Sequence, residues 1–205
     1  MKVVAINGSP RIDGNTAASL KTVCAVLEKN GIETEIINVG DKNICGCKAC
    51  GSCGDCSCVF EGEFFEQTVK KMAEADGIIL GSPTYYASIA GTMKAFLDKA
   101  FYTGSKHFRL KVGAGVVSLR RSGGIAVFNQ LNNYFLISEM IVAPSYYWNI
   151  GHGGAKQEVL RDDEAMCVLE NLGQNMAYLL KLKENANGTV EVPSATPRKK
   201  LNMIR

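Results

Sequence analysis

Residues 2–29 read KVVAINGSPRIDGNTAASLKTVCAVLEK and place a strand, a short loop and a helix in direct succession. Lys2 to Asn7 is a short, mostly apolar and β-branched run that ends at a glycine, which is typical of a strand buried on both faces. Asn15 to Lys29 has apolar residues at helical spacing and is followed by Asn30-Gly31, which predicts an amphipathic helix. The chain therefore opens with the first half of a strand–helix–strand unit.

The same alternation of strand and helix patterns continues along the chain. Further strands are predicted at residues 32–39, 77–81, 111–118 and 139–143, and further helices at residues 63–75, 89–101, 124–137 and 162–183. Five strands that alternate with five helices predict an α/β fold with a parallel sheet covered on both faces. Right-handed crossovers make it a doubly wound, five-stranded, flavodoxin-like sheet with the expected strand order 2-1-3-4-5.

The composition is that of an ordinary globular protein. Of the 205 residues, 46% are hydrophobic and 21% are charged, and the mean hydropathy is +0.01, which excludes disordered and fibrous classes. The net charge of +3 is too balanced to imply a nucleic-acid or membrane partner, and no apolar run approaches the roughly 20 residues of a membrane-spanning helix. The opening residues show no signal-peptide pattern, so a cytoplasmic location is expected.

One flavodoxin-like domain is expected over residues 1–184, with two segments outside the alternating pattern. The first is a Cys-rich loop over residues 40–61, inserted after the second strand. The second is a C-terminal arm over residues 185–205, which carries the basic cluster Arg198, Lys199 and Lys200. The arm is interpreted either as a strap across a neighbouring subunit or as a frayed terminus.

The loop GSPRIDGNT, residues 8–16, joins the first strand to its helix and has the composition of an anion site. A helix N-terminus offers unpaired backbone N–H groups and the positive end of the helix dipole. Ser9, Asn15 and Thr16 add side-chain donors, and Arg11 adds a positive charge. The glycine spacing fits neither the P-loop nor the dinucleotide fingerprint, so a phosphomonoester fits best. The alternative is an ordinary strand-to-helix turn in which Asn15 caps the helix.

Ligands of an open α/β sheet lie beyond the carboxyl ends of its strands, so the loops after the third and fourth strands are the next candidates. Residues 82–86, SPTYY, supply hydroxyl groups and two aromatic rings. Residues 118–124, SLRRSGG, supply glycine-rich backbone that can approach a ring edge, together with two guanidinium groups. A phosphate bound at the first loop and a flat aromatic ring held by the other two describe flavin mononucleotide (FMN).

These motifs together resemble the NADPH-dependent FMN reductase family of the flavodoxin-like superfamily, over residues 1 to about 183. The matching stretches are GSPRIDGNT, GSPTYY with the following SIAGTMKAFLDK, and RRSGG. The resemblance implies a homodimer or tetramer that binds FMN near the subunit interface. The residues that it places around the phosphate are Ser9, Arg11, Asn15 and Thr16. Those that it places along the ribityl and isoalloxazine groups are Pro83, Thr84, Tyr85 and Tyr86, with Ser118, Arg121, Gly123 and Gly124 at the far edge of the ring.

Six of the eight cysteines lie within fourteen consecutive positions, 45 to 58. Cys47, Cys50, Cys53 and Cys58 follow the pattern C-x2-C-x2-C-x4-C, and four thiolates are the ligand set of an iron–sulfur cluster. Cys56 also stands at C-x2-C spacing, so the fourth ligand is either Cys58 or Cys56. A zinc site and a metal-free, redox-sensing loop are the alternatives, and disulfides are disfavoured in a reducing compartment.

The compact spacing resembles the iron–sulfur flavoproteins, a branch of the same family in which the Cys run also follows the second strand. The resemblance implies a [4Fe–4S] cluster near the flavin, with single electrons arriving from a ferredoxin-like donor. Cys24 and Cys167 lie on predicted helices and are expected to be core residues. His107 is expected to be a solvated loop residue. His152 either lies in a loop that caps a flavin or is an ordinary hydrogen-bonded loop residue, and the second interpretation is favoured.

The leading hypothesis is an FMN-dependent oxidoreductase with a [4Fe–4S] cluster, which passes electrons between a ferredoxin-like donor or NAD(P)H and a small acceptor. The flavin carries the chemistry, so no catalytic residue is assigned. One alternative is an NAD(P)H-dependent FMN or quinone reductase without a cluster. The others are a non-catalytic electron carrier and a thiol or metal sensor.

Overall fold

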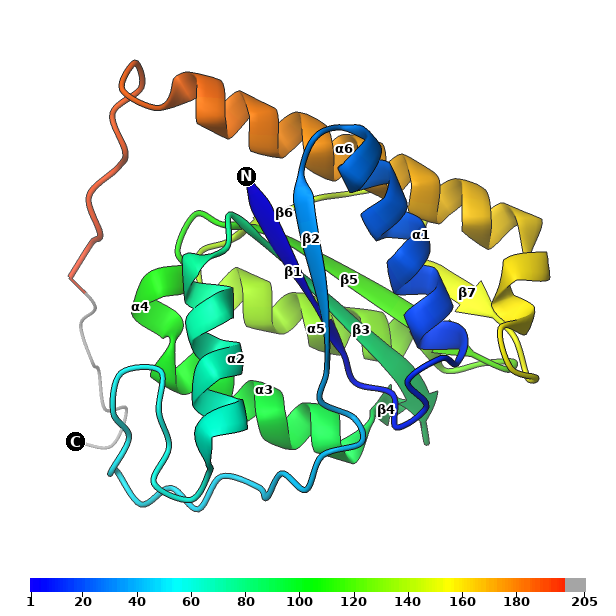
Figure 1. Cartoon of the computed structure of the whole chain (residues 1–205), viewed down its shortest axis with the longest axis horizontal. Helices are drawn as coiled ribbons and strands as arrows, with labels where there is room; N and C mark the ends of the chain where they lie inside the picture. Colours follow the sequence, from blue (N-terminus) through cyan, green and yellow to red (C-terminus); the bar gives the residue numbers. More distant parts are fainter. Residues whose placement is uncertain (198–205) are drawn as a thin grey trace, which may run out of the picture.

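The computed structural model describes residues 1–197 as a parallel sheet between two layers of helices (Figure 1). Within these residues the sheet has seven strands in the order β2-β1-β3-β5-β6, with β4 paired to β3 and β7 paired to β5. The strands are β1 (Lys2–Asn7), β2 (Glu33–Asn38), β3 (Gly77–Tyr85), β4 (Ser88–Ile89), β5 (Val112–Leu119), β6 (Ile141–Val142) and β7 (Ile150–His152). The helices are α1 (Asn15–Lys29), α2 (Glu63–Glu74), α3 (Gly91–Thr103), α4 (Ser105–Phe108), α5 (Gly124–Ile137), α6 (Asp163–Ala186) and the 3-10 helix η1 (Glu158–Arg161).

The strand order confirms the doubly wound, flavodoxin-like prediction. β2, β1, β3, β5 and β6 pair in parallel and correspond to the predicted strands 2, 1, 3, 4 and 5. The described residues add two short strands to this set, β4, which pairs antiparallel with β3, and β7, which pairs with the end of β5. The Cys-rich loop follows β2, as predicted.

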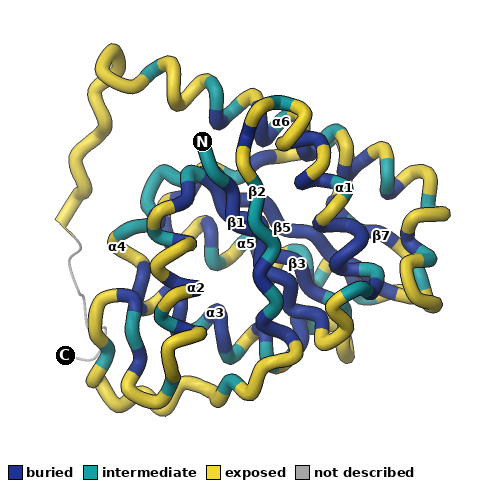
Figure 2. The backbone as a smooth tube through the Cα atoms, viewed as in Figure 1, coloured by how far each residue is buried: buried dark blue, intermediate teal, exposed yellow. Residues whose placement is uncertain are grey.

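Alternate residues of the central strands face two separate cores. Val3 and Ala5 of β1 pack on the side of α1 and α6, whereas Val4 and Ile6 pack on the side of α2, α3 and α5. Successive side chains thus alternate between the two faces of the sheet and are buried on both, as in strands of a parallel sheet. Figure 2 shows the central strands as the dark, buried interior of the molecule. The continuous apolar runs of the sequence therefore form its middle layer.

β3 continues four residues beyond its predicted end at Gly81. Its residues 82–83 pair with residues 117–118 of β5, and Thr84 and Tyr85 then pair with β4. The predicted loop is therefore a strand extension that ends in a hairpin turn, because pairing with neighbouring strands outweighs local turn preference. The extension carries residues of the predicted flavin site beyond the edge of the parallel sheet.

The predicted fifth strand, residues 139–143, is wrong in its extent. Glu139 follows the end of α5 and has a left-handed backbone, with φ of 55°, so only Ile141 and Val142 pair with β5. β7 takes over beside the far end of β5. Between β6 and β7, Asn149 Nδ2 donates to the Gly115 carbonyl at 2.9 Å and takes the place of a ladder hydrogen bond. The intervening chain leaves the sheet and exposes three aromatic side chains, Tyr146, Tyr147 and Trp148.

The C-terminal part of the chain leaves the sheet after a long helix. α6 runs three residues past its predicted end, to Ala186, and residues 187–197 contain no helix or strand. Val190 and Pro193 line a cavity of about 480 Å³ together with Met1, at the start of β1. The basic cluster at residues 198–200 lies outside the described residues. None of the helices in residues 1–197 combines the length and apolar character that spanning a bilayer requires.

Candidate functional site

A cavity of about 240 Å³ opens at the carboxyl ends of β1, β3 and β5. Its walls come from four segments, which are the loop after β1, the ends of β3 and β5, and the loop after β7. The lining residues are Ser9, Arg11, Asn15, Thr16, Pro83, Thr84, Tyr85, Ser118, Leu119, Arg120, Gly153 and Gly154. This is the edge of a doubly wound sheet at which ligands bind.

The loop after β1 is held in place by the protein's own contacts. Asn7 Nδ2 donates to Asn38 Oδ1 of β2 at 2.5 Å, which leaves Asn7 Oδ1 to accept the Ser9 N–H at 3.0 Å. The Ser9 hydroxyl in turn accepts the Arg11 N–H at 3.2 Å. Gly40 passes so close to the loop that a Cβ atom there would lie 2.3 Å from the carbonyl carbon of Ser9. The ends of β1 and β2 therefore fix the shape of the loop.

The first turn of α1 offers backbone donors to the cavity. Gly14 is the N-cap, no side chain caps the helix, and the first turn contains no acidic residue. The first hydrogen bond into the helix runs from the Ala18 N–H to the Gly14 carbonyl at 3.0 Å, so the N–H groups that precede it have no intrahelical acceptor. An anion bound here would meet these donors and the positive end of the helix dipole.

Asn15 ties two loops of the site together, and the alternative in which it caps α1 is wrong. Its Nδ2 donates to the carbonyls of Gly153 and Ala155 at 2.9 and 3.0 Å. Its Oδ1 accepts the Val159 N–H at 3.2 Å. Both amide protons of the side chain are used in these contacts, so the backbone N–H is the remaining donor that Asn15 can offer to an anion.

The turn between β3 and β4 contains two left-handed residues. Tyr86 and Ala87 have φ of 50° and 57°, in a tight hairpin turn where glycine and asparagine are usual. Gln130 of α5 supports the hairpin, because its Oε1 accepts the Ser88 hydroxyl at 2.9 Å and the Ile89 N–H at 3.2 Å. The Tyr86 side chain is fully exposed. Uncommon backbone conformations held by their surroundings cluster at ligand sites.

Thr84 brings an unpaired polar atom to the cavity wall. Its Oγ1 is buried and has no hydrogen-bond partner among the described residues. The hydroxyl of Ser118, on the neighbouring β5, instead lies 3.3 Å from the Ser19 Oγ. An unsatisfied buried hydroxyl costs about 1–3 kcal/mol, so a polar group of a ligand in the cavity would stabilise this arrangement.

The structure brings together eight of the twelve residues predicted to hold a flavin. The eight that line the cavity are Ser9, Arg11, Asn15, Thr16, Pro83, Thr84, Tyr85 and Ser118. The four that lie outside its lining are Tyr86, Arg121, Gly123 and Gly124. Gly123 packs against the hairpin turn, where a Cβ atom would lie 3.1 Å from the Ala87 Cβ. Arg121 and Gly124 line an adjacent cavity of about 260 Å³.

Four lining residues were not predicted, Leu119, Arg120, Gly153 and Gly154. Leu119 and Arg120 belong to the loop that was recognised, but Arg121 was chosen in their place. The two glycines follow β7 in the stretch GHGG. The sequence interpretation had considered this aromatic, glycine-rich stretch as a loop that caps a flavin, but it assigned no ligand contact to its glycines.

His152 is held by a carboxylate beside these cavities, which confirms the favoured interpretation of a hydrogen-bonded histidine. Its N–H and its Nδ1 lie 2.8 and 3.2 Å from Asp162 Oδ2, and the other oxygen, Oδ1, accepts the Ala165 N–H at 3.1 Å. Burial acts to raise the pKa of the Asp162 carboxyl, but the hydrogen bonds from His152 and Ala165 outweigh it and lower the pKa below its ordinary value. The charged carboxylate therefore orients the imidazole.

The Cys-rich loop after β2 is exposed and irregular. Residues 45–52 are all exposed and form no helix or strand, so Cys47 and Cys50 face solvent. Cys53 is half-buried and Cys58 is buried. Burial raises the pKa of the Cys53 thiol, and the neighbouring thiols of Cys58, Cys50 and Cys47 raise it further. Cys53 therefore lies within electrostatic reach of the other three predicted cluster ligands.

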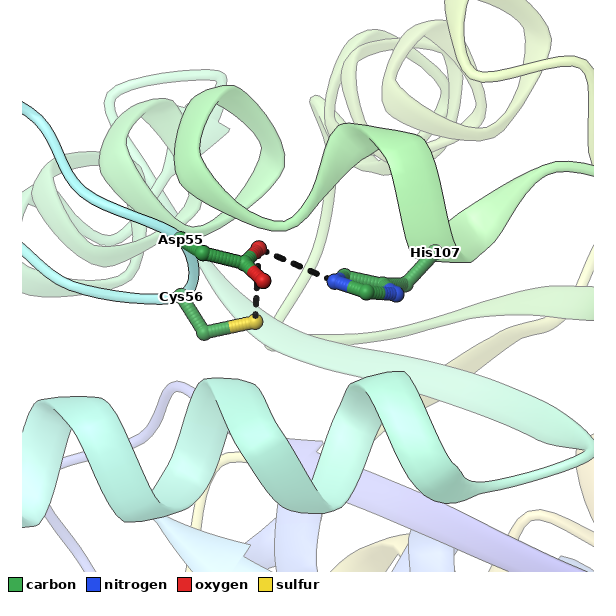
Figure 3. A group of neighbouring side chains, drawn as sticks. All are labelled: Asp55, Cys56 and His107. Carbon is green, nitrogen blue, oxygen red and sulfur yellow. Dashed lines mark hydrogen bonds and ion pairs between the residues drawn. The ribbon is translucent and has the colours of Figure 1, made fainter.

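Cys56 makes different contacts. Its N–H donates to the Thr103 carbonyl at 3.2 Å, and its buried Sγ lies 3.8 Å from Asp55 Oδ1. The same carboxylate oxygen lies 2.9 Å from His107 Nε2 (Figure 3). The prediction of a loop position is therefore wrong for His107, which lies on α4 and pairs with the Cys-rich loop through a side chain that is still 36% exposed.

A buried ion pair closes the base of the Cys-rich loop. The side chains of Lys99 on α3 and Glu61 are only 2% and 8% exposed, and they pair with each other. Cys45 Sγ lies 3.4 Å from Glu61 Oε1 and 3.7 Å from Lys99 Nζ. Because a buried charge requires its partner, this group holds both ends of segment 45–61 on α3.

The two remaining cysteines have different surroundings. Cys24 is buried in the core on the side of α1 and α6, as predicted. Cys167 is exposed on α6, so the prediction of a core residue is wrong. The buried stripe of α6 runs through Ala165, Val168 and Leu169, and Cys167 falls beside this stripe.

Residues 1–155 match the sequence profile of the family described as NADPH-dependent FMN reductase. The chain belongs to this family. An iron-sulfur flavoprotein from Methanocaldococcus jannaschii is 36% identical over 194 residues, which cover 89% of this chain and 98% of that protein. An iron-sulfur flavoprotein from Archaeoglobus fulgidus is 39% identical over 129 residues, which cover 60% of this chain and 62% of that protein. The chain is a flavin-dependent oxidoreductase of the iron–sulfur flavoprotein branch.

The fold is also similar to that of solved flavoproteins. The structure of a flavodoxin from the domain Archaea superposes with a TM-score of 0.61 at 18% sequence identity, over 88% of this chain and 99% of that chain. A likeness at this identity concerns the fold alone. It agrees with the strand order and with the position of the cavity at the carboxyl ends of the strands.

The cavity fits the FMN that the family requires. The uncapped start of α1 and the Arg11 side chain suit a phosphate, and the unpaired Thr84 hydroxyl suits a polar group farther along the ligand. Pro83 and Tyr85 at the end of β3 and Ser118 and Leu119 at the end of β5 line the walls that a flat ring would contact. These features are built by segments that are far apart in the sequence, so they constitute one site only in the folded chain.

Proposed function

We propose that this flavin-dependent oxidoreductase uses FMN together with a [4Fe–4S] cluster to pass electrons between a ferredoxin-like donor or NAD(P)H and a small acceptor. The observation that carries the proposal is the presence of two sites in one chain. One is the cavity at the carboxyl ends of β1, β3 and β5, and the other is the set of four closely spaced thiols after β2. Bound FMN supplies electron transfer in steps of one or two, which connects one-electron carriers with two-electron substrates.

The start of α1 holds the phosphate in this proposal. Ser9 and Thr16 contribute hydroxyl groups, Asn15 contributes its backbone N–H, and Arg11 contributes positive charge. Charge-assisted hydrogen bonds of this kind are about twice as strong as neutral ones, so the phosphate is the main source of affinity. The side chain of Asn15 has a second task, since it holds the loop at Gly153 against the same cavity.

The extended end of β3 and the end of β5 orient the flavin ring. Pro83, Thr84 and Tyr85 line one wall of the cavity, and Ser118 with Arg120 lines another. The four predicted residues outside the lining, Tyr86, Arg121, Gly123 and Gly124, are assigned to the outer edge of the ring. Gln130 supports this edge by holding the β3–β4 hairpin.

Cys47, Cys50, Cys53 and Cys58 hold the cluster. Each thiolate of a four-iron cluster binds a different iron, so the ligands need not converge on one point. The spacing C-x2-C-x2-C of the first three cysteines supports a cluster over a four-thiolate zinc site, whose ligands usually come as two C-x2-C pairs across a longer spacer. Cys58 completes the set because Cys56 is engaged with Asp55 and Thr103.

Anaerobic purification followed by iron, sulfide and flavin analysis tests the proposal. We expect one FMN and about four iron and four sulfide per chain. FMN should bind far more tightly than riboflavin, which lacks the phosphate. Equal affinity for the two flavins would contradict the phosphate site, and FMN without iron would contradict the cluster.

Rapid mixing distinguishes the two electron donors. If a ferredoxin-like protein is the donor, the iron–sulfur absorption bleaches before the flavin absorption does. If NAD(P)H is the donor, the flavin is reduced first, because hydride transfer requires a two-electron acceptor. A homodimer or tetramer and a cytoplasmic location stay predictions from the sequence.

An NAD(P)H-dependent FMN or quinone reductase without a cluster is the second candidate. A cavity of about 600 Å³ supports it, since this cavity shares Arg120, Gly153 and Gly154 with the flavin cavity. Arg120 and Arg161 in its lining suit the phosphates of a pyridine nucleotide next to the flavin. Rapid NADPH oxidation by FMN-loaded protein that is unchanged in Cys50→Ser would favour this candidate.

A further inference from the structure

Three donor side chains outside the proposed cluster set converge near the end of the Cys-rich loop (Figure 3). Asp55, Cys56 and His107 each offer one ligand atom, and these atoms all lie within 4.8 Å of one another. Asp55 and Cys56 belong to the loop, whereas His107 comes from α4. Within residues 1–197 this is the only group of three or more His, Cys, Asp or Glu side chains that gathers so closely.

The Asp55 carboxylate stands at the centre of the group. Its Oδ1 lies 2.9 Å from His107 Nε2 and 3.8 Å from Cys56 Sγ. Its other oxygen, Oδ2, lies 3.0 Å from Lys106 Nζ. The lysine therefore holds the carboxylate by one oxygen and leaves the other directed toward the imidazole and the thiol. Figure 3 shows the three side chains pointing toward one another from the loop and from α4.

The backbone at Cys56 is uncommon for a residue with a side chain. Its φ of 53° lies in the left-handed region, which a non-glycine residue keeps only where its surroundings impose it. The hydrogen bond from the Cys56 N–H to the Thr103 carbonyl belongs to those surroundings. The Thr103 hydroxyl oxygen is itself buried and has no partner among the described residues. The loop thus turns this one thiol toward α3 and α4.

We propose that Asp55, Cys56 and His107 form a mononuclear zinc site that fastens the Cys-rich loop to α4. One nitrogen, one sulfur and one carboxylate oxygen form a donor set that Zn²⁺ accepts, whereas Mg²⁺ and Ca²⁺ require oxygen donors. Cys56 binds as the thiolate and its proton passes to solvent, so two negative ligands neutralise the ion. The fourth position of the tetrahedron is taken by water.

The site assigns separate tasks to neighbouring cysteines. Cys56 belongs to the zinc site, while Cys53 and Cys58, on either side of it, belong to the cluster. Zinc at this position would anchor the loop between two cluster ligands to a helix of the core. The zinc site does not depend on the proposed flavin chemistry, and it differs from a four-thiolate zinc site because it uses only one cysteine.

Zinc competition against a chelator of known affinity, combined with zinc-edge X-ray absorption, tests the site in the full-length holoprotein. We expect one zinc per chain with a single sulfur neighbour and nitrogen or oxygen in the other positions. His107→Ala should weaken zinc binding by more than about 100-fold, since even outer partners of metal ligands contribute roughly 10- to 100-fold. Iron, sulfide and flavin contents should stay at their wild-type values in this variant.

The chain offers a matched control, because His152 is its only other histidine. His152→Ala should keep the wild-type zinc affinity. Cys56→Ser should lose zinc and keep iron, and His107→Ala, at a partly exposed position, provides the same test if Cys56→Ser does not fold.

Three results would each overturn the site. They are failure of the wild-type protein to bind zinc, equal zinc binding by His107→Ala, and zinc with four sulfur neighbours. Loss of iron with retention of zinc in Cys56→Ser would also overturn it. Histidine-dependent zinc in a protein without a cluster would leave the site intact and refute the proposed function alone.

Discussion

The flavin cavity and the Cys-rich loop both begin at the carboxyl ends of strands, yet they are organised in opposite ways. The cavity is bounded by segments that are held from outside it, such as the loop that Asn15 binds at Gly153 and the hairpin that Gln130 supports. The loop is exposed and irregular over residues 45–52, and the buried Lys99–Glu61 pair holds only its base. The fold builds one site by itself, whereas in the proposed function a bound cluster completes the other.

The physical reason lies in the number of anchors. Each wall of the cavity continues directly from a strand, and pairing between strands fixes where that wall ends. The thiols of Cys47 and Cys50 lie in an exposed segment that forms no helix or strand. In the proposed function a bound cluster would order this segment, because metal binding commonly supplies folding free energy. The comparison leads to four predictions, each for a substitution that should affect one of the two regions and leave the other unchanged.

Cys50→Ser should have the largest effect, namely complete loss of iron and sulfide, because the remaining three thiolates cannot complete the ligand set. FMN affinity should change less than about twofold, a difference of under half a kcal/mol. Metal analysis and flavin titration measure the two effects. Cys167→Ser, at an exposed position on α6, is the matched control and should retain both cofactors. Loss of FMN together with iron would show that the loop forms part of the flavin pocket.

Gly40→Ala should damage the flavin site and spare the cluster ligands. The new Cβ atom would lie 2.3 Å from the Ser9 carbonyl carbon and 2.4 Å from the Gly8 oxygen, so the phosphate loop has to move. Overpacking of this kind costs about 1–3 kcal/mol, and we expect FMN affinity to fall roughly tenfold or more. Fluorescence titration with FMN measures the change. Gly46→Ala, whose Cβ would meet no atom within 4 Å, should match the wild type, and an equal loss there would refute the steric argument.

Thr84→Val should weaken FMN binding about fivefold, which corresponds to about 1 kcal/mol for one hydrogen bond to the flavin. The flavin-free protein should not lose thermal stability, because the Thr84 Oγ1 has no partner to lose among residues 1–197. Thr103→Val removes another buried, unpaired hydroxyl outside the cavity lining and should leave FMN affinity unchanged. If Thr84→Val binds FMN as tightly as the control Thr103→Val, Thr84 does not contact the ligand.

Glu158→Gln should have the smallest effect, seen only in the pH dependence of stability. Hydrogen bonds from the Ala155 and Gly154 N–H groups hold the pKa of the Glu158 carboxyl below its ordinary value. The carboxylate therefore stabilises the fold above the unfolded pKa of about 4.3, and this contribution disappears as the pH falls through the lower folded pKa. The wild type should melt above Glu158→Gln at neutral pH and converge with it in acid. A difference in melting temperature that widens below pH 4 would contradict this assignment.

Much of the fold could be predicted from local pattern. The bounds of α1 and α5 match the helical periodicity, and β1 matches its apolar run. The predicted bounds are wrong where contacts with residues distant in sequence determine where a strand ends. β3 is longer than its apolar run because β5 and β4 pair with its extension, and the fifth strand is split because the Asn149 side chain bonds to Gly115.

The candidate site likewise has parts that the sequence predicted and parts that it did not. Three loops of the site were recognised because each follows a predicted strand and carries hydroxyl, aromatic, glycine or arginine residues that suit a flavin. The fourth loop was considered as a flavin cap, but Gly153 and Gly154 were not assigned because the contact of this loop with Asn15 joins residues 138 positions apart. Helical spacing likewise placed Cys24 correctly, but it could not place Cys167 on the exposed side of α6.

The sequence by itself determined three features, which are the order of elements, the anion-binding composition of the first loop and the spacing of the thiols. Each of them depends only on residues that are close together in the sequence. The tertiary structure decided three others, which are the association of Asn15 with the loop after β7, the unpaired hydroxyl of Thr84 and the pairing of Asp55 with His107. They arise when β3, β5 and α4 pack against segments remote in sequence. Hydrogen bonding and burial across such distances depend on the whole fold, which local spacing does not encode.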